Sequence, residues 1–257
     1  MTKSADRPKV RLFVELRLAK GDKMALEANQ SHYLMHVMRL SVGSRLALFN
    51  GRQGEWLAKI MEIEKRAVTV EVFEKIFDQT EDADLWLLFA PLKKARLDYM
   101  VEKAVELGVG RLCPISTERT VVRVINPGRL AAHAIHTAEQ CGRLSVPEVE
   151  EIQKLATRLG DWPDHRRLIY CDEFGQAATL AETLATLKQS ERSGPWAILI
   201  GPEGGFTEQE RRQLHDRDFI TPASLGPLVL RADTAAVTAI ALWQSLVGQW
   251  GGQKASR

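Results

Sequence analysis

Two glycine-bearing loops, each entering a helix, hold the residues of this chain best suited to binding a small molecule. The first loop contains Gly201, Gly204 and Gly205 and follows residues 197–200, an apolar run typical of a buried strand. Glycines at the carboxyl end of such a strand let a ligand lie against backbone N–H and C=O groups. The second loop begins at Leu225, about two dozen residues later. The pair indicates one pocket with two walls; the alternative is two plain connections without a ligand.

Other chemistries lack the residues that they need. No GxGxxG with a later acidic residue is present, and no glycine loop ends in Gly-Lys-Ser/Thr, so neither a dinucleotide fold nor nucleotide hydrolysis is favoured. His32 and His36 have the four-residue spacing of metal ligands, but no third ligand accompanies them and we expect no metal. Local sequence offers no Ser-His-Asp or Cys-His arrangement. The loops therefore predict a binding cleft rather than a nucleophile.

Several cations occupy positions that could meet phosphates. His32, His36 and Arg39 fall on one face of a predicted helix, from which they could reach a nucleic-acid backbone. Four further arginines lie near predicted strand or helix ends: Arg119, Arg123, Arg129 and Arg143. By themselves, these four are better explained as ordinary solvated surface charge.

Charge is distributed unevenly along the chain. Residues 1–73 hold 13 Lys and Arg against 8 Asp and Glu, whereas the remaining residues hold 22 against 25. A basic first part beside a near-neutral remainder favours a polyanionic partner such as nucleic acid, although such imbalances are common on surfaces.

Cysteine usage and hydropathy indicate the compartment. Cys113, Cys141 and Cys171 are odd in number and widely spaced, which argues against disulfides or a zinc site and for a reducing environment. No apolar run marks a signal peptide at the N-terminus, and none reaches transmembrane length. We expect a cytoplasmic protein without a membrane or metal partner.

The first 73 residues predict a small β-barrel domain. Val68, Val70 and Val72 alternate with polar residues, and Asn50-Gly51 between two strand-like runs is a strong hairpin signal. Ser31 is expected to cap a helix over 31–40. The expected strands are Val10–Val14, Lys23–Glu27, Arg45–Phe49, Glu55–Ile63 and Ala67–Phe73.

An acidic connector over 74–84 leads to a second domain over 85–250, in which predicted strands and helices alternate; 251–257 read as a frayed tail. Such alternation is typical of a parallel sheet with helices on both faces. Expected strands are Leu85–Ala90, Arg111–Ile115, Leu168–Cys171, Trp196–Ile200 and Phe219–Ser224. Expected helices are Lys93–Leu107, Pro127–Cys141, Gln153–Leu159, Ala178–Lys188, Glu208–Asp216 and Thr234–Gly248.

Several segments together resemble the small-subunit ribosomal RNA (uracil-N3)-methyltransferase family of the knotted SPOUT superfamily. The resemblance runs nearly end to end, with the segments in the family's order and spacing. They are His32 to Arg39, Val101 to Val109, Thr117-Glu118-Arg119, Ala138-Glu139-Gln140 with Arg143 and Pro147, Ile200 to Phe206, and Leu225 to Ala235.

The resemblance implies an RNA-gripping PUA-like β-barrel followed by an α/β domain with a deep trefoil knot. It implies S-adenosyl-L-methionine bound inside that knot, and a homodimer through the knotted domains. The implied substrate is one uridine of 16S ribosomal RNA within the small ribosomal subunit. The apolar face of the helix over 234–248 is wider than packing against its own domain requires. We therefore expect this helix at the dimer interface.

Carried over by position, the resemblance implies site residues from three segments. The expected cofactor-binding residues are Cys171, Glu173, Leu199, Ile200, Gly201, Pro202, Glu203, Gly204, Gly205, Leu225, Gly226, Leu230, Arg231, Thr234 and Ala235. The expected RNA-binding residues are Arg11, His32, His36, Arg39, Arg119, Arg123 and Arg143, with Arg11 and Arg39 expected from the basic balance of residues 1–73. The chain departs from the family pattern where Leu228 replaces an Arg and Asp233 replaces a Glu.

Methyl transfer to uracil N3 requires that the N3 proton leave, because a neutral imide nitrogen is a poor nucleophile. Glu203 and Asp233 are the candidate acceptors, and Arg231 could stabilise charge on the uracil carbonyls. Each carboxylate could instead satisfy loop N–H groups, and Arg231 could hold a phosphate. Ribose 2′-O-methylation and a catalytically silent RNA-binding or ribosome-assembly protein are the alternative functions.

Overall fold

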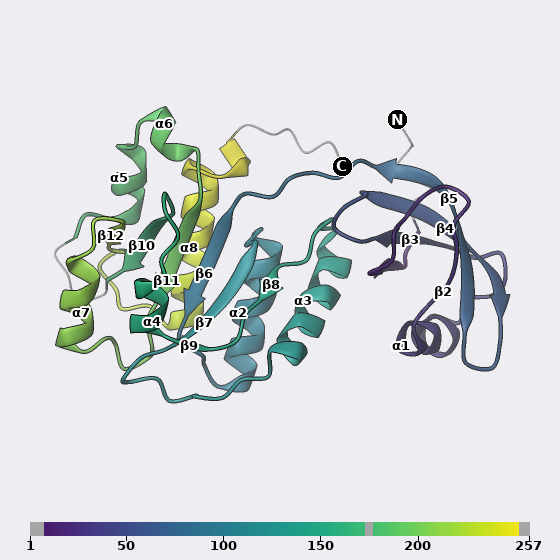
Figure 1. Ribbon diagram of the computed structural model, residues 1–257, viewed down its shortest axis with the longest axis horizontal. Coiled ribbons are helices and arrows are strands. Elements are labelled where there is room, and N and C mark those ends of the chain that lie inside the picture. The colour runs from purple at the N-terminus through teal and green to yellow at the C-terminus, as the bar shows by residue number, and fades with distance from the viewer. Residues whose placement is uncertain (1–7, 173–176, 252–257) are drawn as a thin grey trace. The chain divides into compact units, whose positions relative to one another are not determined.

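The computed structural model describes residues 8–172 and 177–251 (Figure 1). The chain divides into two compact units. One holds the residues up to Glu81 together with Ala138–Val146, and the other holds Asp82–Thr137 with the residues from Pro147 onward. The segment 138–146, which the sequence analysis included in the second domain, therefore groups with the first unit.

The first unit is a five-stranded sheet in the order β1-β3-β4-β5-β2. The β1–β3 pair is parallel, and every other neighbouring pair is antiparallel. Its core is built from alternating side chains such as Leu46, Leu48, Val68 and Val70. The strands are β1 Arg11–Phe13, β2 Lys23–Ala25, β3 Arg45–Phe49, β4 Glu55–Ile63 and β5 Val68–Phe77.

Strand β5 is longer than expected and enters the predicted connector. We expected it to end at Phe73, but it continues to Phe77 because β4 offers pairing partners that far. Phe77 lies opposite Glu55, and Lys75 lies opposite Trp56 with its ammonium 5.6 Å from a Trp56 ring centroid. The Asn50-Gly51 turn does join the antiparallel pair β3 and β4.

The expected role of Ser31 is wrong. Helix α1 spans Ala28–His32 and continues as one π-helical segment, η2 Tyr33–Val37, so Ser31 lies inside the helix rather than at its start. Its side chain is buried, and its hydroxyl is satisfied there: it donates to Leu26 O at 3.2 Å and accepts from Val68 N–H at 3.0 Å. Ser31 thus joins the helix to β5.

The second unit is a parallel sheet in the order β12-β10-β11-β6-β7-β8, with β9 also pairing with β7. Strong apolar runs account for strands buried on both faces, as in β11. The strands are β6 Leu85–Phe89, β7 Arg111–Ser116, β8 Glu148–Val149, β9 Gln153–Lys154, β10 Arg167–Cys171, β11 Trp196–Ile200 and β12 Ile220–Ala223.

Helices cover both faces of this sheet (Figure 1). On one face, α4 and α7 supply Leu155, Leu159 and Leu214 to the apolar core. On the other, α8 packs against β11, α2 and α5. The helices are α2 Lys94–Glu106, α3 Pro127–Cys141, α4 Leu155–Gly160, α5 Leu180–Ala185, α6 Gln189–Arg192, α7 Glu208–His215 and α8 Ala232–Leu246, followed by the 3-10 turn η3 Gln249–Gly251.

Most expected elements of this unit are present, with shifted ends. Asn126 caps α3 as a side-chain acceptor for Arg129 N–H, as expected from the Asn-Pro pair. The expected helix over 153–159 begins only at Leu155, because Gln153 and Lys154 pair with β7. The strand order alone does not determine whether the chain is threaded, so the trefoil knot stays a prediction.

Candidate functional site

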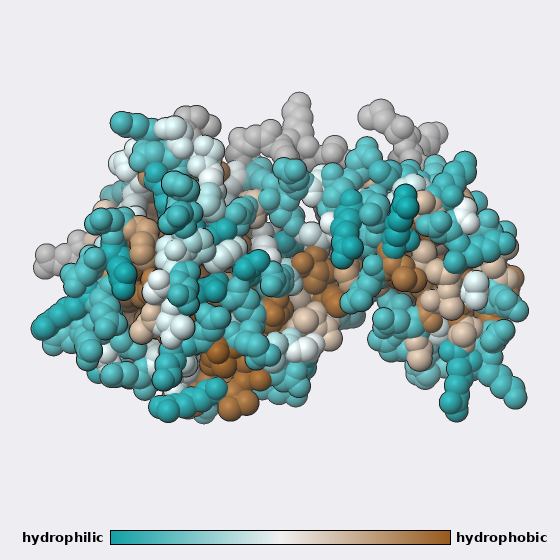
Figure 2. Space-filling view, in the orientation of Figure 1, coloured by the Kyte–Doolittle hydropathy of each residue, from teal (hydrophilic) through white to brown (hydrophobic). Residues whose placement is uncertain are grey.

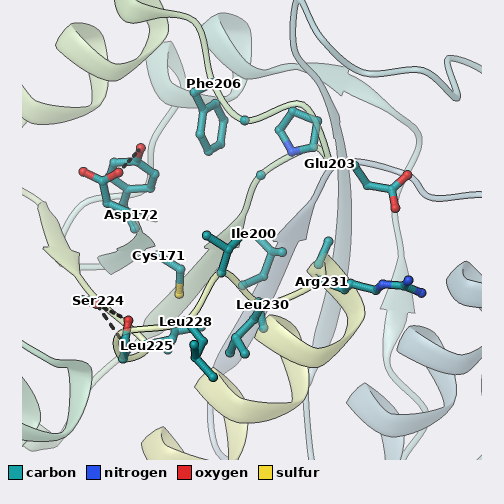
Figure 3. A pocket seen from close by; sticks show the side chains of 18 of the residues that line it. Cys171, Asp172, Ile200, Glu203, Phe206, Ser224, Leu225, Leu228, Leu230 and Arg231 are labelled. Atoms are coloured by element: carbon teal, nitrogen blue, oxygen red, sulfur yellow. Dashed lines mark hydrogen bonds between the residues drawn. The ribbon is translucent and has the colours of Figure 1, made fainter. Parts of the chain in front are cut away.

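A cavity of about 280 Å³ lies where β10, β11 and β12 end (Figure 3). Since parallel strands place their carboxyl ends at one edge of the sheet, three successive loops meet there. The lining residues are Tyr170, Cys171, Asp172, Ile200, Gly201, Pro202, Glu203, Gly205, Phe206, Ser224, Leu225, Gly226, Pro227, Leu228, Val229, Leu230, Arg231, Ala232 and Ala235. The two glycine loops therefore do form one pocket.

The first glycine loop is held in a compact turn. Gly205 N–H donates to Pro202 O at 2.9 Å, and Gly205 has a φ of 66°, a conformation that favours glycine. At Gly201, a Cβ atom would lie 2.5 Å from the Phe206 ring. The loop ends in a capping box, in which Thr207 and Glu210 exchange backbone-to-side-chain hydrogen bonds and start α7.

The second loop is shaped at its start by Ser224, whose hydroxyl accepts from Gly226 N–H at 3.2 Å (Figure 3). Gly226 has a φ of 120°. The loop then exposes Leu228 and Val229 before Arg231 forms the N-cap residue of α8. Leu228, the departure from the family pattern, thus presents an apolar side chain at the rim of the cavity.

Cys171 contributes an apolar wall. Burial raises the pKa of its thiol to about 12, so the group stays protonated at neutral pH. Beside it, the Asp172 side chain is buried, with Tyr170 Oη donating to it at 3.3 Å and His215 Nε2 3.6 Å away.

Eleven of the expected cofactor-binding residues line the cavity: Cys171, Ile200, Gly201, Pro202, Glu203, Gly205, Leu225, Gly226, Leu230, Arg231 and Ala235. Leu199 does not line it, because its side chain packs into the core of the sheet. Gly204 and Thr234 are exposed beside the cavity rather than lining it. Glu173 lies outside the described residues.

The structure adds lining residues that the sequence did not indicate, such as Tyr170, Asp172 and Phe206. Tyr170 and Asp172 flank Cys171 at the end of β10, so the strand end itself was an available signal. Phe206 directly follows the last glycine of the first loop, and its ring fills the space beside Gly201.

A cation that local sequence did not reveal joins the two candidate carboxylates. Arg96, near the start of α2, donates from Nε to Asp233 Oδ2 at 3.0 Å and from Nη2 to Oδ1 at 2.8 Å. Its Nη1 donates to Glu203 Oε1. The Arg96 hydrogen bonds hold the pKa of Asp233 below its ordinary value.

Arg119 lies beside the first glycine loop. Its guanidinium donates to Gly204 O at 3.0 Å, and the neighbouring Glu118 N–H donates to Glu210 at 2.9 Å. Both contacts connect the turn after β7 to the glycine loop. Arg119 can therefore help to shape the pocket, in addition to the expected RNA contact.

Arg123 is exposed and lines a second, open cavity of about 620 Å³ with Lys154 and Gln213. Arg129, by contrast, is paired with Asp98 at 2.7 Å. Of these two arginines, Arg123 remains a candidate for a phosphate contact.

Arg143 is buried and the Arg11 side chain is only 8% exposed, which disfavours the RNA contacts expected of them. The Arg11 guanidinium donates to the buried Glu55 at 2.9 Å and to the carbonyls of Ala138 and Arg143, both at 2.6 Å. It also covers the Phe49 ring at 3.9 Å. A buried carboxylate requires such a partner, so Arg11 serves the core of the unit.

His32, His36 and Arg39 are exposed together on the first unit. The two imidazole rings lie 4.6 Å apart, and Arg39 adopts a φ of 52° just beyond the π-helical turn. This group, here called the His-Arg surface, keeps the geometry expected for contact with phosphates.

The described residues contain no group of three or more His, Cys, Asp or Glu side chains able to hold a metal ion. Nor does any helix among them have the length and apolar character needed to cross a membrane.

Family models match both units. A model described as RNA methyltransferase domain matches residues 79–244, and one described as RNA methyltransferase PUA domain matches residues 26–73. A Rickettsia conorii protein named ribosomal RNA small subunit methyltransferase E is 32% identical over 90% of this chain and 93% of its own length. A Bacillus subtilis protein of the same name is 25% identical over 90% and 94%.

Solved structures agree with these matches. A ribosomal RNA small subunit methyltransferase E from Neisseria gonorrhoeae, bound to S-adenosyl methionine, is 28% identical with a TM-score of 0.82, covering 92% of this chain and 97% of that one. A Legionella pneumophila protein in complex with the cofactor SAM is 29% identical with a TM-score of 0.80, with the same coverage.

Proposed function

This chain belongs to the RNA methyltransferase family, and we propose that it transfers a methyl group from S-adenosyl-L-methionine to N3 of a uridine in 16S ribosomal RNA. The RNA is methylated within the small ribosomal subunit, in the cytoplasm. The observation that carries the proposal is the cavity formed by two glycine loops at the carboxyl ends of β10, β11 and β12.

The residues of this cavity fit the cofactor. Apolar side chains such as Ile200, Leu225 and Leu230 suit a purine ring, while the backbone around Gly201 and Gly205 offers N–H and C=O groups at close range. A side chain at Gly201 would collide with Phe206. S-adenosyl-L-methionine supplies a methyl group already activated on a sulfonium, so the chain needs no nucleophile of its own.

The remaining task of the protein is to orient the base and remove a proton. Holding uridine N3 in line with the methyl carbon lowers the entropic barrier by up to several kcal/mol. Glu203 and Arg231 line the cavity, and Asp233 lies beside them through Arg96. These residues form the proposed catalytic group, with Arg231 stabilising charge on a uracil carbonyl.

RNA is the partner of the PUA-like unit, and the His-Arg surface is the proposed site of contact. His32, His36 and Arg39 are all exposed, with the two imidazole rings 4.6 Å apart, whereas Arg11 is engaged inside the same unit. Arg123 extends the proposed RNA contacts to the methyltransferase unit.

A homodimer through α8 is also part of the proposal. Ala236, Ile240 and Trp243 are buried within the unit itself, which leaves the half-buried Leu242 and Leu246 to face a second copy. The face shown in Figure 2 is mainly hydrophilic and carries apolar patches on both units. Light scattering at micromolar concentration tests this point; a monomer would contradict it.

The reaction is tested with small subunits from a strain that lacks this enzyme. After reaction with the purified protein and S-adenosyl-L-methionine, the RNA is digested and its nucleosides are identified by mass spectrometry. We expect one 3-methyluridine per subunit. A 2′-O-methyl nucleoside would refute the N3 assignment, and absence of any product would favour a catalytically silent RNA-binding protein.

A further inference from the structure

The two candidate carboxylates of the site are not equivalent. Both oxygens of Asp233 are engaged, since Arg96 Nε reaches Oδ2 at 3.0 Å while Arg96 Nη2 and Thr234 N–H reach Oδ1 at 2.8 and 3.0 Å. The side chain is only 15% exposed and does not line the cavity. A carboxylate with both oxygens occupied by donors is a poor proton acceptor.

Glu203 offers what Asp233 lacks. It lines the cavity, its side chain is 47% exposed, and only Oε1 receives Arg96. Within the part of the chain that the structure describes, no hydrogen bond to Oε2 is found. One oxygen is therefore fixed by a cation, while the other has no hydrogen-bond donor among the described residues and is available to a ligand.

Arg231 completes the arrangement. It is exposed, lines the same cavity, and has no ion pair among residues 8–172 and 177–251. Figure 3 shows the Glu203 and Arg231 side chains extending to the same side of the site, opposite the side of Asp172. An open acceptor and an unpaired donor thus extend to the same side of one cavity.

We propose that Glu203 and Arg231 together read the imide edge of uracil, and that Glu203 Oε2 takes the N3 proton. The imide edge presents carbonyl, N–H and carbonyl in a row, which a carboxylate oxygen and a guanidinium complement. Cytosine presents a lone pair at N3 and an amine beside it, so the same two groups would meet it with the wrong polarity. This rests on the proposed function.

The proton and electron pairs balance. The N3–H proton goes to Glu203 Oε2, and the freed electron pair forms the bond from N3 to the methyl carbon. The carbon–sulfur bond breaks with its pair remaining on sulfur, which loses its positive charge as the carboxylate loses its negative one. The proton then leaves Glu203 to water. Arg96, fixed by Asp233, is a positioning residue that holds Oε1.

The test compares matched amide variants in single-turnover methylation of unmodified small subunits, with cofactor affinity measured by calorimetry. Glu203→Gln should slow the reaction by about 100-fold or more, at nearly unchanged cofactor affinity. We expect the single-turnover rate of the wild-type protein to fall as the pH is lowered, and the rate of Glu203→Gln to lack this fall. Asp233→Asn should slow the reaction less and keep that decline. Glu208→Gln, an exposed carboxylate on α7, is the control for an added amide.

Arg96 is tested as a positioning residue by Arg96→Gln and Arg96→Lys. Loss in the first and partial rescue in the second, with the acid decline retained, support positioning of Glu203. If Asp233→Asn loses more activity than Glu203→Gln, or Glu203→Gln keeps the acid decline, the inference is overturned. A wild-type product other than 3-methyluridine overturns the proposed function instead, so the two failures are distinguishable.

Discussion

The guanidinium of Arg96 lies between two carboxylates, Glu203 in the first glycine loop and Asp233 in the first turn of α8. Such a shared cation resolves the problem of placing two negative charges next to a pocket, since each carboxylate keeps an opposite charge within hydrogen-bond distance. It also makes the two acids unequal, because one is held by two bonds and the other by one. The hydrogen bonds of Arg96 therefore distinguish the two candidate proton acceptors, which the sequence motif alone did not.

The Arg96–Asp233 pair should make stability depend on pH in the acid range. The pKa of Asp233 is lowered in the folded protein, so the pair stabilises fully above about pH 3.8, the ordinary value, and less as pH falls through the lowered pKa. Arg96→Gln should reduce the free energy of unfolding by roughly 1–2 kcal/mol at pH 7, and this difference should narrow toward pH 3.

Urea unfolding from pH 7 to pH 3 measures this difference. The exposed pair of Arg212 and Glu208 provides the control, since Arg212→Gln should change stability by no more than about 0.5 kcal/mol at any pH. A wild-type advantage over Arg96→Gln that grows on acidification would contradict the assignment.

Ala235 allows a direct steric test of the cofactor site. It lines the cavity from the first turns of α8, where any side chain adopts the helical backbone without strain. Ala235→Phe should fill the cavity and reduce affinity for S-adenosyl-L-methionine at least about tenfold, a loss of about 1.4 kcal/mol, measured by calorimetry. Ser245→Phe, exposed on the same helix, should leave it unchanged.

The structure favours Ala235 over Gly204 for this test. A side chain at Gly204 would face the Arg119 side chain at 3.5 Å, outside the cavity, so a bulky residue there would not fill the cofactor space. Unchanged affinity in a folded Ala235→Phe protein would show that the cofactor binds elsewhere.

At the scale of elements, Ser31 shows how a helix is fixed to a sheet by one hydroxyl. Ser31→Ala would leave Val68 N–H without its acceptor in a buried position. The expected cost is about 1–3 kcal/mol in the free energy of unfolding, seen as a lower denaturation midpoint with an unchanged slope. Ser41→Ala, at an exposed position on the same unit, should cost far less; equal effects would contradict the account.

The elements that could be predicted from sequence are those specified by local patterns. Strands β3, β4 and β11 have the expected ends, because apolar residues bounded by turn residues determine them. The capping box at Thr207 likewise needs only four consecutive residues. The prediction for Ser31 was wrong because the sequence does not distinguish a serine at an N-cap from a buried serine inside a helix. Only the packing partner distinguishes the two.

Long-range pairing could not be predicted from such patterns. Arg96 and Asp233 are 137 positions apart, and Arg11 meets a carbonyl 127 positions away. Nothing in the spacing of either arginine distinguishes it from solvated charge, since only the folded chain brings its partner near. The expected RNA role of Arg11 therefore stays a prediction that the burial of its side chain disfavours, whereas the two glycine loops, each locally encoded, do form one pocket.

At the scale of the whole molecule, positive charge is concentrated in residues 1–73, which hold 13 Lys and Arg against 8 Asp and Glu. Because the side chains of Arg11 and Arg143 are buried, only the exposed Lys and Arg side chains can present positive charge to a partner. The His-Arg surface combines one of them, Arg39, with the exposed imidazoles of His32 and His36 on α1 and η2. Contact with RNA phosphates through it should release counterions, so affinity should depend on salt.

Replacing His32, His36 and Arg39 by Gln should weaken binding to small-subunit RNA and lower the salt dependence of the logarithm of affinity. The decrease should be up to about one unit for each phosphate that the protein no longer neutralises. Arg66→Gln, in the exposed turn between β4 and β5, removes a charge elsewhere on the unit and should leave the slope nearly unchanged. Cofactor affinity should be the same in all proteins, because the cavity belongs to the other unit. An unchanged slope in the triple variant, or an equal fall in Arg66→Gln, would contradict a localised RNA contact and leave only diffuse attraction by the charge of the unit.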